Sequence, residues 1–162
     1  MAKKSQRSAR RSVPLKKALD RQLLALAKAA ASARLTGSHI DEHSYDFDAG
    51  EPDLGYLCLL THDLLDNVVR TLASLRTSFL GSEPMAIATV IEIQRQQLFK
   101  VQAVLETMTH SMRTIRSQQR EADLSPMFVE LGTACESGLG ALDPVALGLP
   151  IPNLCSSHSP DE

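Results

Sequence analysis

The fold is decided by two long segments, LGYLCLLTHDLLDNVVRTLASLRTSFL (residues 54–80) and PMAIATVIEIQRQQLFKVQAVLETMTHSMRTIRSQ (residues 84–118), with the breaker Gly81-Ser82-Glu83-Pro84 between them. In each segment apolar residues recur at steps of three and four, which is the spacing of one face of an α-helix. The residues that form the two apolar seams are Leu57, Leu64, Val68, Leu72 and Leu75 in the first segment and Ile91, Leu98, Val101, Leu105 and Met108 in the second. The sequence therefore predicts a long antiparallel helical hairpin.

The apolar arc of the first segment is too wide for a single neighbour. Cys58, Leu65 and Val69 form a second apolar stripe beside its seam, and in the second segment only Gln94 interrupts the apolar row. A two-helix hairpin alone would leave much of this surface in water. We therefore expect an all-α fold in which the hairpin is completed into a three- or four-helix bundle, either within the chain or by dimerisation.

The composition is that of one small helical domain. A chain of 162 residues is one domain's worth of sequence. Hydrophobic residues make up 43% of it, which is enough for a core, but only 4% of the residues are aromatic and Trp is absent. The apolar supply is thus mostly Leu, Ala, Val and Ile, and no stretch alternates β-branched and polar residues as a half-buried strand does.

The chain before the hairpin divides into three parts. Residues 1–12 are a basic leader of low hydrophobicity, which we expect to be disordered. A helix is predicted over residues 13–36, with Pro14 in its first turn and Thr36-Gly37 as its stop signal. Residues 38–53 hold six acids and neither Lys nor Arg, and we interpret them as an acidic linker. The apolar stripe of the predicted helix consists of Leu15, Leu19, Leu23, Leu26, Ala30 and Ala33.

A fourth helix is predicted after the hairpin, over residues 125–142. Its interior glycines, Gly132, Gly138 and Gly140, each cost about 1 kcal/mol relative to alanine, so its pattern is the weakest of the four. The helical domain then spans residues 13–142. Residues 143–162, rich in Pro, Gly and Ser, are predicted to form an irregular tail.

The net charge of -2 conceals a strong asymmetry. The first 21 residues hold eight basic residues and one acid, Asp20, whereas the remainder holds nine basic and eighteen acidic residues. Lysine and arginine clusters bind phosphate backbones by counterion release, without sequence preference. No aromatic residue accompanies the leader's cations, which argues against recognition of single strands by stacking. The residues predicted to contact phosphate or nucleic acid are Lys3, Lys4, Arg7, Arg10, Arg11, Lys16 and Lys17.

Other interpretations of the basic leader remain open. It could attach to an anionic membrane surface, pair with the acidic linker of residues 38–53, or only solubilise the chain. Its Arg- and Ser-rich, acid-poor composition also resembles that of a mitochondrial transit peptide.

The run His39-Ile40-Asp41-Glu42-His43 matches the H-x-x-E-H order of inverted zinc proteases, in which a helix presents both histidines to the metal. Here the run lies in an acidic stretch with almost no apolar periodicity. We interpret it as a solvated loop and predict no metal site and no cofactor. The chain also lacks a Gly-rich phosphate loop, a serine nucleophile motif and zinc-type cysteine spacing. We therefore predict no catalytic residue and a protein that is not an enzyme.

His62-Asp63, a histidine followed by an acid, lies early in the first helix of the predicted hairpin. This dipeptide, together with residues 91–101 of the second helix, resembles the dimerisation and phosphotransfer domain of histidine kinases. The resemblance implies that His62 accepts a phosphoryl group and that Asp63 helps to activate it. Asn67 and Leu65 stand where that family usually has a proline and a basic residue, and no ATP-binding domain follows, so the implied function is that of a degenerate phosphotransfer module.

Cysteine usage and hydropathy indicate a cytoplasmic protein. Cys58, Cys135 and Cys155 are widely spaced and form no C-x-x-C pair, which suits a reducing compartment. No apolar run approaches the ~18 to 20 residues that span a bilayer. The long charged leader and the interruption by Lys28 argue against a signal peptide.

The sequence supports three hypotheses for function. In the first, the protein is a small non-enzymatic interaction or oligomerisation protein whose seams bind a second copy or a partner helix by apolar burial. In the second, it is a nucleic-acid-associated accessory protein that uses the basic leader as an electrostatic arm. In the third, it is a degenerate phosphotransfer module with His62 as the acceptor.

Overall fold

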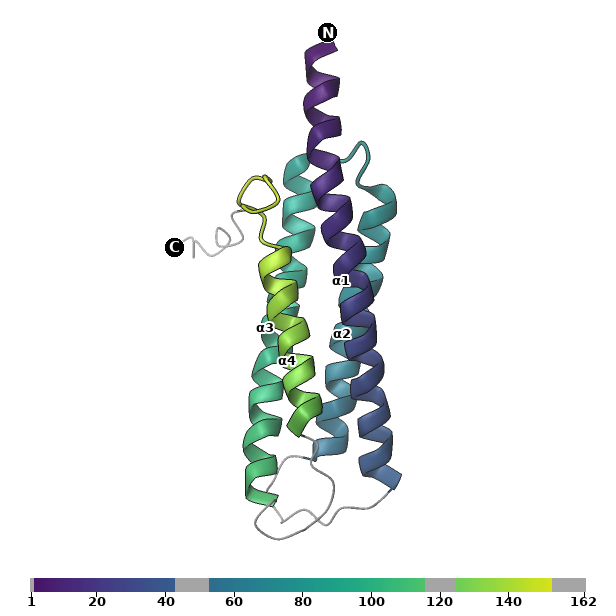
Figure 1. Ribbon diagram of the computed structural model, residues 1–162, viewed down its shortest axis with the longest axis vertical. Coiled ribbons are helices and arrows are strands. Elements are labelled where there is room, and N and C mark those ends of the chain that lie inside the picture. Colours follow the sequence, from purple (N-terminus) through teal and green to yellow (C-terminus); the bar gives the residue numbers. More distant parts are fainter. Residues whose placement is uncertain (1, 43–52, 116–124, 153–162) are drawn as a thin grey trace, which may run out of the picture.

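The protein is all-α, as the sequence predicts. The computed structural model describes residues 2–42, 53–115 and 125–152, and these residues form four helices and no strand. The helices are α1 (Ala2–Glu42), α2 (Leu54–Ser78), α3 (Pro84–Ile115) and α4 (Ser125–Ala141), which Figure 1 labels.

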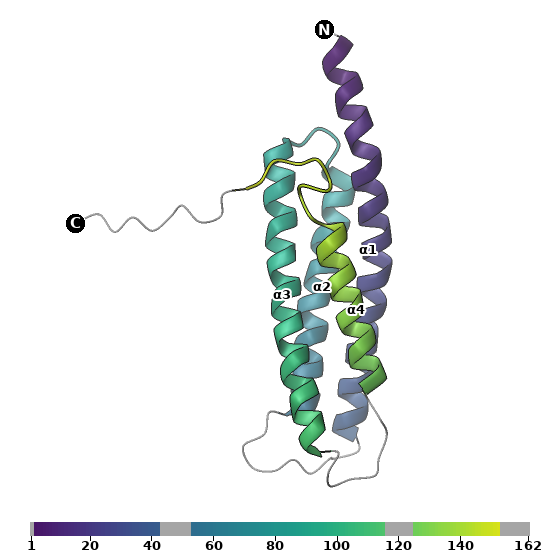
Figure 2. The same ribbon diagram turned by 60° about the vertical axis from the view of Figure 1, so that its left-hand side comes forward.

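The four helices pack as an antiparallel bundle. α1 packs against α2 and α4, and α3 packs against the same two helices, so α1 and α3 lie diagonally across the core. Successive helices run in opposite directions, and both views place α4 beside α1 and α3 (Figures 1 and 2). In this arrangement α1 and α4 of the same chain cover the hairpin of α2 and α3.

The core consists of aliphatic side chains from all four helices. Burial of such surface, at about 25 cal/mol per Å², is the main favourable term in folding. The largest fully buried apolar side chains include Leu19 and Leu26 on α1, Leu65 and Leu72 on α2, Ile91 and Leu98 on α3, and Leu131 on α4.

α1 is longer at both ends than the helix predicted over residues 13–36. It begins at Ala2, so the backbone of residues 2–12, where we expected disorder, is helical. Ala, Arg and Lys are strong helix formers, and they dominate this stretch. At the other end, Thr36 and Gly37 do not stop the helix, because both are buried in the bundle and α1 continues to Glu42.

Gly37 marks a close approach between α1 and α2. A Cβ atom at this position would lie 3.2 Å from each of three atoms of α2: Cβ of Cys58, the carbonyl oxygen of Gly55 and Cγ of Leu59. Only a residue without a side chain lets the two backbones come so near. The glycine is therefore a packing residue and not a stop signal. Residues 38–42, expected in the acidic linker, belong to α1, and residues 43–52 of that linker lie outside the described residues.

The turn between α2 and α3 lies where the sequence predicts it. α2 ends at Ser78, and α3 begins at Pro84, whose missing N–H costs nothing at the first position of a helix. Gly81 has a φ of 104°, a left-handed conformation that glycine adopts without strain. α3 is described to Ile115, and residues 116–118, the predicted end of this helix, lie outside the described residues.

α4 forms despite its three glycines, over nearly the predicted range. One of them has a packing role, because a Cβ atom on Gly138 would lie 3.0 Å from Cδ1 of Leu98. Around Gly132 and Gly140 no such atom would meet a neighbour within 4 Å. α4 is therefore tolerant of side chains at two of its glycines and intolerant at the third.

The described segment after α4, residues 142–152, forms neither helix nor strand, and it packs onto the bundle. Leu142, Pro144 and Leu147 are buried. The N–H of Leu147 donates to the carbonyl of Asp143 at 3.0 Å, which closes a compact turn. Residues 153–162 of the predicted tail lie outside the described residues.

Candidate functional site: a basic arm and the polar face of α2

The basic N-terminal part of α1 extends past the end of the bundle. Leu15 is the first residue of the described core. Before it, the purple start of α1 projects beyond the other helices in both views (Figures 1 and 2). We call residues 2–17 the basic arm. It carries all of the predicted phosphate contacts, namely Lys3, Lys4, Arg7, Arg10, Arg11, Lys16 and Lys17, of which the last two have exposed, described side chains.

The base of the arm is a cationic surface, and Asp20, the acid among its lining residues, is paired. Asp20 forms an ion pair with Arg76 of α2, and both side chains are partly exposed, so the pair contributes less than about 1 kcal/mol. Arg21, the next residue, is exposed. An open hollow of about 430 Å³ at this point is lined by Lys16, Lys17, Asp20, Arg21 and Leu24.

The described ends of the predicted acidic linker, Glu42 and Asp53, lie at the opposite end of the bundle from the start of the arm. α1 has 41 residues and, at about 1.5 Å per residue, is about 60 Å long. Glu42 ends α1, and Asp53 caps α2 by accepting a hydrogen bond from the N–H of Tyr56 at 3.1 Å. The linker therefore starts and finishes at the far end. The described ends of the linker are several Debye lengths from residues 2–12, which argues against pairing between leader and linker of one chain.

The predicted interaction seam lies inside the bundle. Leu57 and Leu64 are partly buried and pack against the core. A partner could reach these side chains only after the bundle had opened. The other eight seam residues are buried: Val68, Leu72, Leu75, Ile91, Leu98, Val101, Leu105 and Met108.

Exposed apolar side chains are spread over all four helices. The more exposed ones include Leu35 on α1, Tyr56 on α2, Phe99 on α3 and Val129 on α4. Single exposed apolar residues of this kind are normal on a protein surface. None of the described helices contains an apolar stretch long enough to cross a membrane.

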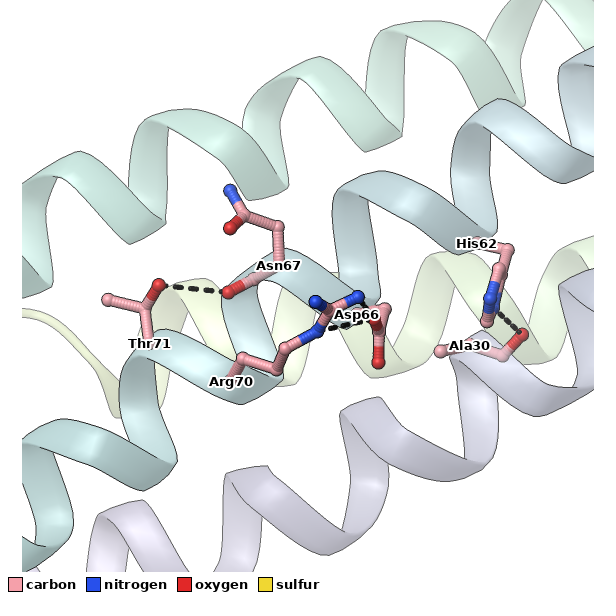
Figure 3. A network of polar contacts seen from close by, with 6 residues as sticks. All are labelled: Ala30, His62, Asp66, Asn67, Arg70 and Thr71. Atoms are coloured by element: carbon pink, nitrogen blue, oxygen red, sulfur yellow. Dashed lines mark hydrogen bonds and ion pairs between the residues drawn. The ribbon is translucent and has the colours of Figure 1, made fainter.

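His62 is half-buried between α2 and α1, in a defined hydrogen bond. Its Nδ1 lies 3.0 Å from the carbonyl oxygen of Ala30, as Figure 3 shows. Because a carbonyl oxygen can only accept, Nδ1 carries the hydrogen and donates it. In the neutral ring, the lone pair is then on Nε2. Asp63, the partner implied by the resemblance to histidine kinases, is exposed beside it on α2.

The polar face of α2 continues from His62 with Asp66, Asn67, Arg70 and Thr71 (Figure 3). Nε of Arg70 donates to Oδ2 of Asp66 at 2.7 Å, and the hydroxyl of Thr71 donates to the carbonyl of Asn67 at 2.9 Å. The ion pair spans one helical turn in the favourable order and is worth about 0.3 to 0.5 kcal/mol. The carboxylate of Asp66 is thus already paired with the guanidinium of Arg70.

The H-x-x-E-H run is helical in its first part. His39 is exposed on α1 and Glu42 is the last residue of that helix, where we expected a loop, and His43 lies outside the described residues. No cluster of three or more His, Cys, Asp or Glu residues that could hold a metal ion occurs within residues 2–42, 53–115 and 125–152.

Two of the cysteines are thiols of the core. Cys58 and Cys135 are both buried. Burial, together with the smaller effect of the neighbouring Glu136 carboxylate, raises the pKa of the Cys135 thiol to about 12. At neutral pH Cys135 is therefore protonated and a poor nucleophile. Cys155 lies outside the described residues.

Gln22 and Gln94 are polar residues in the core, at 4% and 5% exposure. Gln94 is the residue that interrupts the apolar row of the hairpin. The sequence pattern places Leu23, and not Gln22, in the apolar stripe of the first helix. In the structure Gln22 is buried and Leu23 is only partly buried. The signal that identifies Gln22 is its spacing of three from Leu19 and four from Leu26.

No protein-family model matches the chain, and no curated protein or solved structure matches it either.

Proposed function

We propose that this protein is a cytoplasmic, non-enzymatic helical bundle that binds nucleic acid through the basic arm, residues 2–17. The observation that supports the proposal best is the projection of this arm past the bundle (Figures 1 and 2). Up to Arg21 the chain has eight basic residues and one acid, against nine and eighteen in the remainder. A polyanion can approach the arm while it stays clear of the acidic bundle, from which like charge repels it.

The spacing of the cations suits a continuous helix. Lys3, Arg7, Arg10, Lys17 and Arg21 follow one another at steps of four, three, seven and four, which place five positions on one helix face. At about 1.5 Å per residue this row is about 27 Å long. Lys17 and Arg21, at its lower end, are exposed on the bundle itself. The row is long enough to meet several phosphates of one duplex.

A nucleic acid suits the arm better than a membrane surface does. An interfacial membrane helix needs a wide apolar face, rich in Leu, Phe or Trp. Residues 1–12 contain no apolar residue except one Met and two Ala. Contacts to a phosphate backbone need only positive charge, and they carry no sequence information. We therefore expect binding that is salt-sensitive and indifferent to base sequence.

Neutralising the projecting part of the arm is expected to weaken DNA binding by about tenfold to a hundredfold at moderate salt. The variant replaces five cations by glutamine, namely Lys3, Lys4, Arg7, Arg10 and Arg11. Because each neutralised phosphate releases about 0.9 counterion, the slope of log affinity against log salt should flatten by about four units. Fluorescence anisotropy with a labelled random-sequence duplex at several salt concentrations measures both effects.

The control removes exposed cations from the bundle, away from the arm. It replaces by glutamine Lys28, Arg34, Arg70 and Lys100, all of which are exposed. This control should keep the wild-type salt slope. Equal losses in the two variants would show that binding follows net charge and not the arm. Binding to vesicles with anionic lipids, without binding to DNA, would show that the ligand of the arm is a membrane surface and not a nucleic acid.

A second candidate function is phosphoryl acceptance at His62, and the hydrogen bond to Ala30 favours it. With the Nδ1 hydrogen held by that carbonyl, Nε2 is the nitrogen that can attack phosphorus. Leu65, which stands where the kinase family has a basic residue, is fully buried, so this departure concerns the core and not the surface around His62. In the transfer, an Nε2–P bond forms as the bond from phosphorus to the oxygen of the donor breaks.

A small acyl phosphate, offered as donor, is expected to leave an acid-labile phosphoryl group on His62. Mass spectrometry of peptides kept at alkaline pH locates it. His62→Gln should abolish the labelling, and His39→Gln, a change at another helical histidine, should leave it intact. Equal labelling of His39 and His62, or none at either, would rule this function out.

A further inference from the structure

The outer side of α1, which faces away from the bundle, carries a line of exposed apolar residues. Of the described helices, α2 and α4 pack against α1, which lies at the edge of the bundle (Figure 2). Leu24 and Leu35 are 62% and 72% exposed on its outer side. Ala27 and Ala31, between them, are also exposed, and steps of three and four place all of these residues on one helix face. We call Leu24, Ala27, Ala31 and Leu35 the outer stripe.

Charges of opposite sign stand at the two ends of the outer stripe. Lys17 is exposed about two turns before Leu24, and Glu42, the last residue of α1, comes about two turns after Leu35. Lys17 is 18 residues from Leu35, and Leu24 is 18 residues from Glu42. Because 18 residues make about five complete turns of an α-helix, these four positions lie on the same face. This face of α1 is therefore basic at its start, apolar in its middle and acidic at its end.

The order of residues on this face is complementary to itself in the antiparallel direction. When a second copy of α1 lies against the first in the reverse direction, one register brings Leu24 opposite Leu35 of the second copy. The same register brings Lys17 opposite Glu42 of the second copy. Two-fold symmetry repeats both contacts at the other end of the pair. In a parallel pair each charge would instead meet a like charge, so the order of charges favours the antiparallel direction.

The centre of the outer stripe suits close contact between two helices. Ala27 and Ala31 have small side chains, and the distance between packed helices depends on the side chains at the contact. Lys28 and Arg34 are exposed beside the stripe, and their long side chains keep the charges in water while the stems cover apolar surface. Two backbones can therefore approach along the stripe without burying an unpaired charge.

Other occupants fit the outer stripe less well. A helix that lies on a membrane surface needs a wide apolar face, whereas this stripe is a single line of two leucines and two alanines and is followed by an acid. A helix of another protein would have to present an acid opposite Lys17 and a base opposite Glu42. A second copy of α1 in the reverse direction presents both, with an apolar stretch of matching length between them.

We infer that the outer stripe binds a second copy of this protein, in an antiparallel two-fold pair of α1 helices. The pair directs the two basic arms in opposite directions. Because the contact is a single line of side chains, it buries less than the ~1,200 Å² of a standard interface, and we expect a dissociation constant on the order of 100 µM. At the low micromolar concentrations of a denaturation experiment the chain is therefore monomeric, with its core complete.

Sedimentation velocity at low salt, over protein concentrations from about 10 to about 500 µM, tests the pair directly. The sedimentation coefficient of the wild type should rise with concentration from that of a monomer toward that of a dimer. Salt at about 0.5 M should move this rise to higher concentration, because it screens the attraction between Lys17 and Glu42. A monomer at every concentration would overturn the inference, and cosedimentation of that monomer with anionic vesicles would assign the stripe to a membrane instead.

Reversal of one charge at a time tests the antiparallel register. Lys17→Glu and Glu42→Lys should each weaken the pair by about tenfold or more, because each variant places like charges at both ends. An equimolar mixture of the two variants should regain the wild-type affinity, since the mixed pair again has opposite charges at both ends. Lys100→Glu, a reversal at an exposed site on α3, should leave the affinity unchanged. Undiminished association of the single variants, or a mixture as weak as either of them, would overturn the antiparallel pair.

Discussion

Leu98→Ala is expected to lower the free energy of unfolding by about 3 kcal/mol. Leu98 is fully buried on α3, and its Cδ1 packs against the backbone of α4 at Gly138, where a Cβ atom would come within 3.0 Å. Truncation removes the buried methyl groups and leaves a cavity between two helices that cannot close without moving both. Urea denaturation followed by circular dichroism measures the change from the shift of the midpoint at constant m-value.

The matched control is Leu35→Ala, because Leu35 is 72% exposed on α1. This change should alter stability by less than about 0.5 kcal/mol. A similar loss of unfolding free energy in both variants would mean that the effect of truncating a leucine does not depend on its burial in this bundle.

Thermal denaturation of the wild type at several protein concentrations distinguishes the bundle from the oligomerisation hypothesis. Leu98 belongs to the seam that we expected a partner or a second copy to cover, and here the chain's own helices bury it. The melting temperature of the wild type should therefore not depend on protein concentration. A melting temperature that rises with concentration would show that a second copy completes the fold.

Gly37→Leu is expected to destabilise the protein by about 3 kcal/mol, by forcing α1 away from α2. A Cβ atom alone would lie 3.2 Å from the carbonyl oxygen of Gly55 and from Cβ of Cys58, and neither atom can move without its helix. The remaining atoms of leucine would require a larger displacement. Thermal denaturation by calorimetry measures the loss.

Gly132→Ala is the control for the effect of glycine itself. Nothing lies within 4 Å of the position of its Cβ, so alanine should stabilise α4 by about 0.5 to 1 kcal/mol through helix propensity. The two changes therefore have opposite signs, although both remove a glycine from a helix. Stabilisation by Gly37→Leu would show that Gly37 is not a close contact between α1 and α2. The interpretation of Gly37 as a helix stop signal would then be favoured again.

The helices of the hairpin were predictable because their signal is local and long. Apolar residues at steps of three and four over more than six turns leave few alternatives to an amphipathic helix, and Gly81 and Pro84 punctuate the turn between them. The same logic failed at Thr36-Gly37. Glycine ends many helices, but it also allows close packing, and the sequence alone does not distinguish the two uses.

The residues of the candidate site were predictable to different degrees. The cations of the basic arm are visible in the sequence, since charge is a property of residue type. Their projection from one end, and the position of Glu42 about 60 Å away at the other end of α1, follow from α1 being one continuous helix of 41 residues. The state of His62 was not predictable, because its partner, the carbonyl of Ala30, is on another helix.

The sequence by itself determined that this protein is all-α, where its hairpin turns and that its charge is divided between a basic beginning and an acidic remainder. These properties depend on residue type and on spacing within one helix. Only the tertiary structure decided that α1 and α4 bury the seams, that Gly37 and Gly138 are contacts between helices, and that Gln22 is buried in the core. Those outcomes depend on which faces of distant helices meet, and packing in three dimensions sets this, not the periodicity of any one segment.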